Sequence, residues 1–249
     1  MQRFFLNPTH IGEKTVTFPE NISHQLRHVL RTRSGDQVIV LDNLGNEYDV
    51  VLQVSDGRKI GGQITAKRAA KGEPDIILTL MLCLSQREKF EWMLQKCTEL
   101  GAARFVPVIS SRSLVQADKN NAKKLIRWER ILTEAAEQSG RGQVPILHPP
   151  LKLEQAARLD LPETALRIIP DVRAGSMPLK QVLAEQVSDH TPRQIAALIG
   201  PEGGFSAEEV EHAVQTGFIP VTLGKRVLRM ETAAVAVSAL VMYHFGQME

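Results

Sequence analysis

The sequence predicts an α/β protein in which a small β-rich domain precedes a larger domain of alternating strands and helices. Two observations support this fold class. The first 70 or so residues read as short strands separated by turn residues, whereas apolar strands alternate with amphipathic helices from Pro74 onward. The change falls at Lys71-Gly72-Glu73-Pro74. We therefore expect domains at residues 1–72 and 73–249.

The N-terminal domain is expected to be a small β-barrel interrupted by one helix. The helix is predicted over Glu20–Arg31, because Ile22, Leu26, Val29 and Leu30 share one face. Turn residues at Asn43–Asn46 and Ser55–Gly57 separate the later strands. The expected strands are Arg3–Leu6, Thr15–Phe18, Gln37–Leu41, Tyr48–Val54 and Gly62–Lys67.

The C-terminal domain is expected to hold a largely parallel sheet with helices on both faces. After a first strand at Ile76–Leu84, Ser85 and Glu88 have capping-box spacing and predict a helix that ends at Gly101. A second capping box, Ser206 with Glu209, predicts a helix that ends at Gly217. The other expected elements are strands at Phe105–Ile109, Ala165–Ile169, Gln194–Ile199 and Phe218–Leu223 and a helix at Lys119–Gln138.

The last predicted helix starts near Glu231 and is apolar on nearly every face. Such a helix must be buried inside its domain or in a subunit interface. This pattern predicts a homodimer.

Composition indicates a soluble cytoplasmic protein with no membrane segment and no metal. Of the 249 residues, 43% are hydrophobic and 23% are charged. No apolar run reaches the roughly 18 to 20 residues that span a bilayer, and the N-terminus lacks a signal-peptide pattern. Cys83 and Cys97 lie in apolar settings and are interpreted as core residues, and the seven histidines show no metal-ligand spacing.

The positive charge is concentrated toward the N-terminus. Residues 1–72 hold ten Lys and Arg against seven Asp and Glu, a charge of +3, whereas the remainder carries −1. The predicted N-terminal helix contains Arg27 and Arg31. This distribution fits either a nucleic-acid-facing domain or an ordinary solvated surface.

A glycine-rich turn follows the strand at Gln194–Ile199, in the stretch L-I-G-P-E-G-G-F-S. Such a turn before a helix commonly holds a phosphate on backbone N–H groups. Here Glu202 lies in its middle, and no Lys or Ser/Thr follows at the phosphate-loop positions. A carboxylate would repel phosphate, so the turn predicts a different ligand.

A second glycine loop, L-G-K-R-V-L-R-M-E-T-A at residues 223–233, follows the next strand. Ligands of open α/β sheets bind outside the carboxyl ends of strands, where both loops are expected. Their glycines allow a ligand to approach the backbone closely. The expected ligand is flat, held by main-chain hydrogen bonds, and neutral or cationic near Glu202, which favours S-adenosylmethionine over ATP or NAD.

The two loops together resemble the RsmE family of 16S ribosomal RNA uridine methyltransferases. Further agreement comes from R-F-F at 3–5, H-V-L-R with G-D at 28–36, Q-K-C-T-E-L-G at 95–101 and E-A-A-E-Q-S-G-R at 134–141. One departure is Met230, where the family more often has Thr. The resemblance covers nearly the whole chain.

The resemblance implies a SPOUT-type α/β domain with a C-terminal trefoil knot, a PUA-like N-terminal barrel and a homodimer. It also implies methylation of the N-3 atom of a uridine in 16S ribosomal RNA, with the RNA or the small ribosomal subunit as partner. In that picture three loops surround S-adenosylmethionine. The implied cofactor-binding residues are Ile169, Leu198, Ile199, Gly200, Glu202, Gly203, Gly204, Leu223, Gly224, Val227, Leu228, Arg229, Thr232 and Ala233.

Transfer of a methyl group to a uracil nitrogen mainly requires that the two reactants be positioned and that the deprotonated uracil be stabilised, so a nearby cation is useful and a strong general base is not obligatory. Arg229 and Arg141 are the candidates for that cation. Glu231 is expected either to orient one of them or to begin the last helix, where an acid complements the macrodipole. The expected RNA-binding residues are Arg3, Arg27, Arg31 and Arg33.

Two other functions stay open at this point. A ribose 2′-O methyltransferase would use the same cofactor loops, and a non-catalytic RNA-binding or ribosome-assembly protein could keep the fold. A dinucleotide oxidoreductase is disfavoured, because no G-x-G-x-x-G follows the first strand of the α/β domain.

Overall fold

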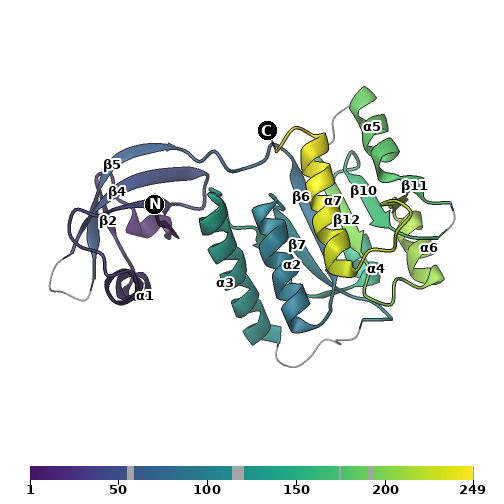
Figure 1. The fold of residues 1–249 in the computed structure, drawn as a ribbon, viewed down its shortest axis with the longest axis horizontal. Helices are drawn as coiled ribbons and strands as arrows, with labels where there is room; N and C mark the ends of the chain where they lie inside the picture. Colours follow the sequence, from purple (N-terminus) through teal and green to yellow (C-terminus); the bar gives the residue numbers. More distant parts are fainter. Residues whose placement is uncertain (55–58, 114–120, 174, 190–192, 249) are drawn as a thin grey trace. The chain divides into compact units, whose positions relative to one another are not determined.

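A computed structural model describes residues 1–54, 59–113, 121–173, 175–189 and 193–248 (Figure 1). The chain forms two compact units. Met1–Glu73 and Thr133–Val144 make the N-terminal unit, and Pro74–Leu132 and Pro145–Glu249 make the C-terminal unit. The turn expected at Ser55–Gly57 lies outside the described residues, as does the expected start of the long helix at Lys119.

The N-terminal unit contains a five-stranded sheet in the order β1-β3-β4-β5-β2. β1 runs parallel to β3, and the other neighbours are antiparallel. Asn43 and Gly45 have positive φ angles of 60° and 91°, which allow the tight turn between β3 and β4. The strands are β1 (Arg3–Phe5), β2 (Thr15–Thr17), β3 (Gln37–Leu41), β4 (Asn46–Gln53) and β5 (Gly61–Ala69).

An apolar core lies against this sheet. Phe4 and Phe18 contact edge to face, with ring centroids 6.4 Å apart, and Leu26 from the helical segment is fully buried among them. A short 3₁₀ turn, η1 (Pro8–His10), follows β1. The small β-rich domain predicted from turn spacing is therefore present as a five-stranded sheet.

The predicted helix over Glu20–Arg31 was wrong in its end and its regularity. α1 (Glu20–His24) continues as a π-helical segment, η2 (Gln25–Val29). Arg31 then adopts a positive φ of 53°, which ends any helix. π-Helical turns are rare and occur frequently at functional sites.

The C-terminal unit contains an eight-stranded sheet in which the paired strands of the described residues run parallel. Its main path runs β11-β13-β10-β12-β6-β7-β8, and β9 also pairs with β7. The carboxyl ends of the strands consequently share one edge. The strands are β6 (Ile77–Cys83), β7 (Arg104–Ile109), β8 (Ile146–Leu147), β9 (Leu151–Lys152), β10 (Leu166–Pro170), β11 (Met177–Pro178), β12 (Gln194–Ile199) and β13 (Ile219–Thr222).

The helices of the C-terminal part are α2 (Arg87–Glu99), α3 (Asn121–Ser139), α4 (Leu153–Ala157), α5 (Leu179–Asp189), α6 (Ala207–Gln215) and α7 (Met230–His244). α2 and α7 pack side by side (Figure 1), and α7 also contacts β12 and β6. The chain therefore leaves β13 near one side of the sheet and returns over its middle strands. α3 crosses the boundary between the two units.

One predicted capping box is present and the other is absent. Ser206 Oγ accepts from the Glu209 backbone N–H at 3.2 Å, and a Glu209 carboxylate oxygen accepts from the Ser206 N–H at 2.8 Å. The box predicted at Ser85 was wrong, because α2 begins at Arg87 with Gln86 as its N-cap. The Leu84 N–H donates to the Val108 carbonyl at 2.8 Å. This bond keeps the chain extended through Leu84 and leaves Ser85 buried.

No helix in the described part of the chain has the length and apolar character needed to cross a membrane.

Candidate functional site

A cavity of about 680 Å³ lies at the carboxyl ends of β10, β12 and β13. Three segments of the C-terminal unit form its walls: residues 170–172, residues 199–205 and most of residues 221–233. Lys89 from α2 completes the lining. Both glycine loops selected from the sequence therefore open onto one cavity, at the edge of the sheet where α/β proteins bind ligands.

Most of the predicted cofactor-binding residues line this cavity. Ile169 and Leu198 do not, because both are fully buried in strands, each directly before a lining residue. Thr232 is exposed on the first turn of α7 and does not line it either. The lining members are Ile199, Gly200, Glu202, Gly203, Gly204, Leu223, Gly224, Val227, Leu228, Arg229 and Ala233.

The glycines shape the two loops in different ways. A Cβ atom on Gly200 would lie 2.9 Å from the Phe205 ring, so the close packing of that ring requires glycine. Gly204 and Gly224 have φ angles of +66° and +114°, which side chains rarely adopt. At Gly203 a Cβ atom would meet Arg112 atoms at 3.7 Å, an ordinary contact. A side chain would therefore clash with the rest of the protein at Gly200 but not at Gly203.

The acid in the glycine turn has a cationic partner. Lys89 Nζ lies 3.2 Å from a Glu202 carboxylate oxygen, and both side chains are roughly a quarter to a third exposed. Asp171, which also lines the cavity, is likewise paired with Arg173, whose Nε lies 2.7 Å from its carboxylate. Two of the acids in the cavity wall are thus neutralised by nearby cations.

Sequence reasoning missed Lys89. Its partner Glu202 lies 113 positions further along the chain, so no local pattern connects them. Its position on the first turn of the helix that follows β6 was the available signal. Arg226, which lines the cavity between Gly224 and Val227, was also not selected.

Two of the three predicted catalytic residues reach the cavity. Arg229 is the exposed N-cap residue of α7, and Glu231 lies in that helix's first turn. Glu231 Oε2 is buried and has no hydrogen-bond partner among the described residues. An unpartnered carboxylate oxygen is costly unless a ligand donates to it. Met230, between these two residues, is buried and also lines the cavity.

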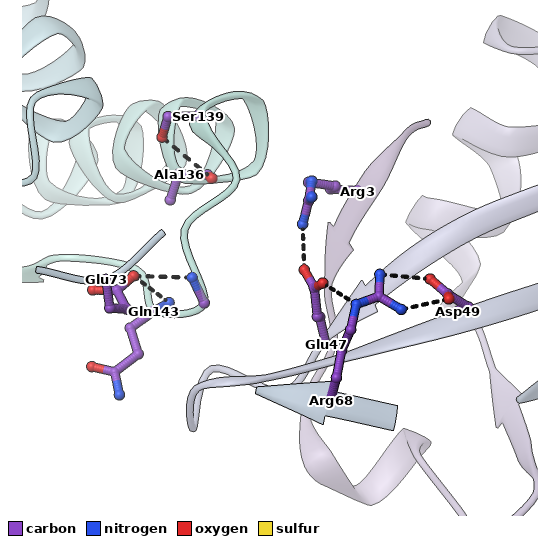
Figure 2. Close-up of polar contacts among 9 residues, drawn as sticks. Arg3, Glu47, Asp49, Arg68, Glu73, Ala136, Ser139 and Gln143 are labelled. Carbon is purple, nitrogen blue, oxygen red and sulfur yellow. Dashed lines mark hydrogen bonds and ion pairs between the residues drawn. The ribbon is translucent and has the colours of Figure 1, made fainter. Parts of the chain in front are cut away.

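The third candidate, Arg141, belongs to the N-terminal unit and does not line the cavity. Its side chain is 3% exposed, and Nε and Nη2 lie 3.2 and 2.9 Å from the Glu73 carboxylate. That carboxylate also accepts from the backbone N–H groups of Gly142 and Gln143. Figure 2 shows the contact between Glu73 and Gln143. Arg141 thus contributes to the attachment of Glu73 to the turn after α3.

The predicted RNA-binding arginines occupy different settings in the N-terminal unit. Arg3 is committed to Glu47, with an Nη1–Oε2 distance of 2.7 Å, and Arg68 binds the other oxygen of the same carboxylate (Figure 2). Arg27 is partly buried, whereas Arg31 and Arg33 are exposed. The exposed pair is best placed to meet a ligand.

Among the described residues, no group of three or more His, Cys, Asp and Glu side chains could hold a metal ion. Burial raises the pKa of the Cys83 and Cys97 thiols, and both cysteines are free and buried. They are core residues, as predicted.

Comparisons with known proteins define the class of this chain. Residues 72–242 match the RNA methyltransferase domain family. The ribosomal RNA small subunit methyltransferase E of Synechocystis sp. is 37% identical over 232 residues, which cover 93% of this chain and 74% of that protein. Its namesake from Bacillus subtilis is 31% identical over 98% of this chain and 96% of its own length. The chain belongs to the ribosomal RNA small subunit methyltransferase E family.

Solved structures agree with this assignment. The Neisseria gonorrhoeae ribosomal RNA small subunit methyltransferase E, bound to S-adenosylmethionine, superposes with a TM-score of 0.87 at 32% identity and covers 98% of this chain and 97% of its own. A Legionella pneumophila protein in complex with the same cofactor gives a TM-score of 0.85 at 30% identity, with 97% and 96% coverage.

Proposed function

We propose that this protein is an S-adenosylmethionine-dependent methyltransferase that modifies the N-3 atom of a uridine in 16S ribosomal RNA. The observation that carries the proposal is the cavity where both glycine loops meet, in a chain whose family relatives are ribosomal RNA methyltransferases. The Neisseria and Legionella structures hold S-adenosylmethionine. The same cofactor is the proposed ligand here.

The residues of the cavity fit that cofactor. Its volume of about 680 Å³ is within the usual range for small-molecule sites. The backbone groups of Gly200–Gly204 and Leu223–Leu228 offer hydrogen bonds to an adenine and a ribose. Glu231 Oε2 is an acceptor without a hydrogen-bond partner among the described residues, which suits an ammonium or an amine. The acids that line the cavity balance its cations, so the cavity wall does not repel a cationic ligand.

When bound, S-adenosylmethionine supplies a methyl group on a sulfonium for an in-line displacement. The uracil N-3 gains the methyl group and loses its proton, so negative charge develops on the ring as the proton leaves. Arg229 lines the cavity, is exposed and makes no ion pair among the described residues, so it can stabilise the uracil oxygens. Arg226 is a second cation on the same wall.

The fold and assembly implied by the resemblance are part of this proposal. A trefoil knot is supported by the return of α7 over β12 and β6 after the 223–229 loop. A PUA-like barrel is supported by the five-stranded sheet around one core. A homodimer is supported by exposed Leu240 and Tyr243 on α7. The proposal also includes a cytoplasmic location, domains at residues 1–72 and 73–249, and activity without a metal ion.

Two experiments test the proposed function. Calorimetry in the presence of a chelator should detect binding of S-adenosylmethionine or its demethylated product, and no heat with either ligand would contradict the proposal. Small ribosomal subunits from cells lacking this enzyme are then incubated with the protein and labelled cofactor, and the labelled nucleotide is mapped. We expect label on a uracil N-3. Label on a ribose would favour the 2′-O reaction, and binding without transfer would favour a non-catalytic role.

A further inference from the structure

The turn that follows β7, Ser110–Ser113, is bound to the glycine turn that follows β12. Arg112 Nη1 donates to the Gly203 carbonyl at 3.1 Å, and the Ser111 N–H donates to a Glu209 carboxylate oxygen at 2.7 Å. Gly203 lines the cavity, whereas Arg112 and Glu209 do not. Two bonds from outside the cavity therefore support one of its walls.

Glu209 joins two loops with one carboxylate. Its Oε1 accepts from the Ser111 N–H at 2.7 Å, and its Oε2 accepts from the Ser206 N–H at 2.8 Å. A capping box needs only the bond to Ser206. The second bond attaches the start of α6 to the turn after β7. The two bonds end on different oxygens of the carboxylate, so a glutamine, with one acceptor oxygen, can accept only one of them in this geometry.

The Ser110–Ser113 turn, which supplies these two donors, is itself held by internal hydrogen bonds. The Ser113 N–H donates to the Ser110 carbonyl at 3.1 Å, and the Ser110 N–H donates to Ser113 Oγ at 3.1 Å. The two hydroxyl groups are 3.0 Å apart. The turn continues directly from β7, a strand paired with β6 over five positions. Arg112 therefore projects from a part of the fold that is fixed by its own hydrogen bonds.

Arg112 lies along the backbone of the glycine turn. Its Cβ and Cδ would be 3.7 Å from a Cβ atom built on Gly203. Lys89 also pairs with Glu202 of the turn, and Arg173 Nη1 donates to the Ser206 carbonyl at 3.4 Å. Groups at Glu202, Gly203 and Ser206 are thus held by side chains from three different segments. A turn fixed in this way keeps its backbone groups oriented before a ligand arrives.

We propose that Arg112 and Glu209 are positioning residues for the cofactor-binding turn. Arg112 fixes the Gly203 carbonyl and Glu209 fixes the peptide at Ser206, so that the backbone between them presents its polar groups to the cavity. The inference rests on the proposed function, because it takes S-adenosylmethionine as the ligand. It predicts that both residues govern affinity for the cofactor and leave affinity for RNA unchanged.

The test measures the dissociation constant of the demethylated cofactor by calorimetry, together with KM for cofactor, KM for RNA and the melting temperature. We expect Arg112→Ala and Glu209→Gln each to weaken cofactor binding about tenfold, the scale of one hydrogen bond to a charged group. KM for RNA should not change. Arg112→Lys should restore part of the affinity, since it keeps a cationic donor.

Two controls separate positioning from folding. Arg158→Ala removes an exposed arginine after α4 and should leave every measurement unchanged. Ser206→Ala removes the hydroxyl that caps α6 but keeps both Glu209 carboxylate bonds, so it should lower the melting temperature more than the cofactor affinity. Because Arg112 is exposed, its alanine variant is expected to fold even if the Glu209 variant does not.

Several outcomes would overturn the inference. Unchanged cofactor affinity in a folded Arg112→Ala variant would remove Arg112 from the positioning role. A raised KM for RNA with normal cofactor affinity would make it an RNA contact instead. A wild-type protein that binds neither form of the cofactor would overturn the proposed function itself, which distinguishes that failure from the first two.

Discussion

Glu137 near the end of α3 has a carboxyl group in an unfavourable setting for its charge. Burial raises the pKa of Glu137 to about 7, the negative charge of Glu134 adds to this effect, and a hydrogen bond from the Phe5 N–H opposes it. Its ordinary value is 4.5. Between these two values the folded chain keeps a proton that the unfolded chain has lost. Stability should therefore fall as pH rises from about 4.5 to about 7 and then level off.

Glu137→Gln should remove this loss of stability at higher pH. The amide oxygen can still accept from the Phe5 N–H, but the side chain no longer ionises. We expect the free energy of unfolding of the variant to exceed that of wild type by about 2 kcal/mol at pH 8, after allowance for the solvent-exposed part of the group. The difference should vanish near pH 4.5.

Urea unfolding at several pH values measures this difference. Glu13→Gln, which changes an exposed acid of the same unit, is the matched control and should show no such pH dependence. Equal stabilities of wild type and Glu137→Gln at pH 8 would contradict the assignment of an ionised, poorly solvated carboxyl.

At the scale of single elements, the sequence predicts the bounds of a strand or helix well where a local sequence pattern alone determines them. β12 was predicted with the observed bounds, Gln194–Ile199, because a buried apolar run is closed by a glycine turn. The pattern S-x-x-E occurs before both α2 and α6 and forms a capping box only at α6. Pairing of Leu84 with Val108 in the neighbouring strand decides the difference. Local sequence does not contain that information.

The same limit applies to the candidate site. Glycine spacing identified both loops of the cavity, because backbone conformation requires glycine at several of their positions. Lys89 and Arg112 lie 113 and 91 positions from their partners in the glycine turn. The fold brings these residues together, so neither could be selected from spacing. Arg141 was selected from a sequence motif, and in the structure it pairs with Glu73 and does not line the cavity.

Two glycines of the turn should respond differently to alanine. Gly200→Ala places a Cβ atom 2.9 Å from Phe205 Cε2, so the ring must move from the cavity wall. We expect a loss of stability of about 1 to 3 kcal/mol, the usual cost of overpacking, and weaker cofactor binding. Gly203→Ala meets only ordinary contacts, so it should keep wild-type stability.

Thermal unfolding with and without the demethylated cofactor checks both variants. If Gly203→Ala, or the larger Gly203→Val, lowers cofactor affinity without lowering stability, the bound ligand occupies the space beside Gly203. Equal cofactor affinity in Gly203→Val and wild type would show that the ligand does not approach this backbone position.

At the scale of the whole molecule, α7 has one buried and one exposed side. Ala234, Val237 and Val241 are fully buried, but Leu240 and Tyr243 are 47% and 74% exposed in the single chain. Their exposure, three residues apart on one helix, fits a subunit interface. Sedimentation at micromolar concentration should detect a dimer, and Leu240→Glu with Tyr243→Glu should give the 27.7 kDa monomer. A wild-type protein that sediments only as a monomer would contradict the homodimer.

Net charge cannot explain why the N-terminal unit, rather than the C-terminal unit, would bind RNA. Residues 133–144 belong to the N-terminal unit and bring Glu134 and Glu137 with Arg141, and Glu73 also joins it. These additions lower the charge of that unit from +3 to +1. Any preference of the N-terminal unit for RNA must therefore come from local clustering, and Arg31 and Arg33 beside η2 form one exposed basic pair.

Charge reversal in the two units should therefore have separate effects. Arg31→Glu with Arg33→Glu should weaken RNA binding and reduce its salt dependence, because fewer phosphates are neutralised, while cofactor affinity stays unchanged. Arg229→Ala should leave RNA binding nearly intact and lower turnover by about two to three orders of magnitude, the scale for one group that stabilises transition-state charge. Lys14→Glu, at another exposed site of the N-terminal unit, is the control for a general charge effect.

Binding titrations at several salt concentrations and single-turnover rates measure both properties. An unchanged salt slope in the Arg31 and Arg33 double variant would place RNA recognition elsewhere, and normal turnover without the Arg229 side chain would exclude it from the reaction.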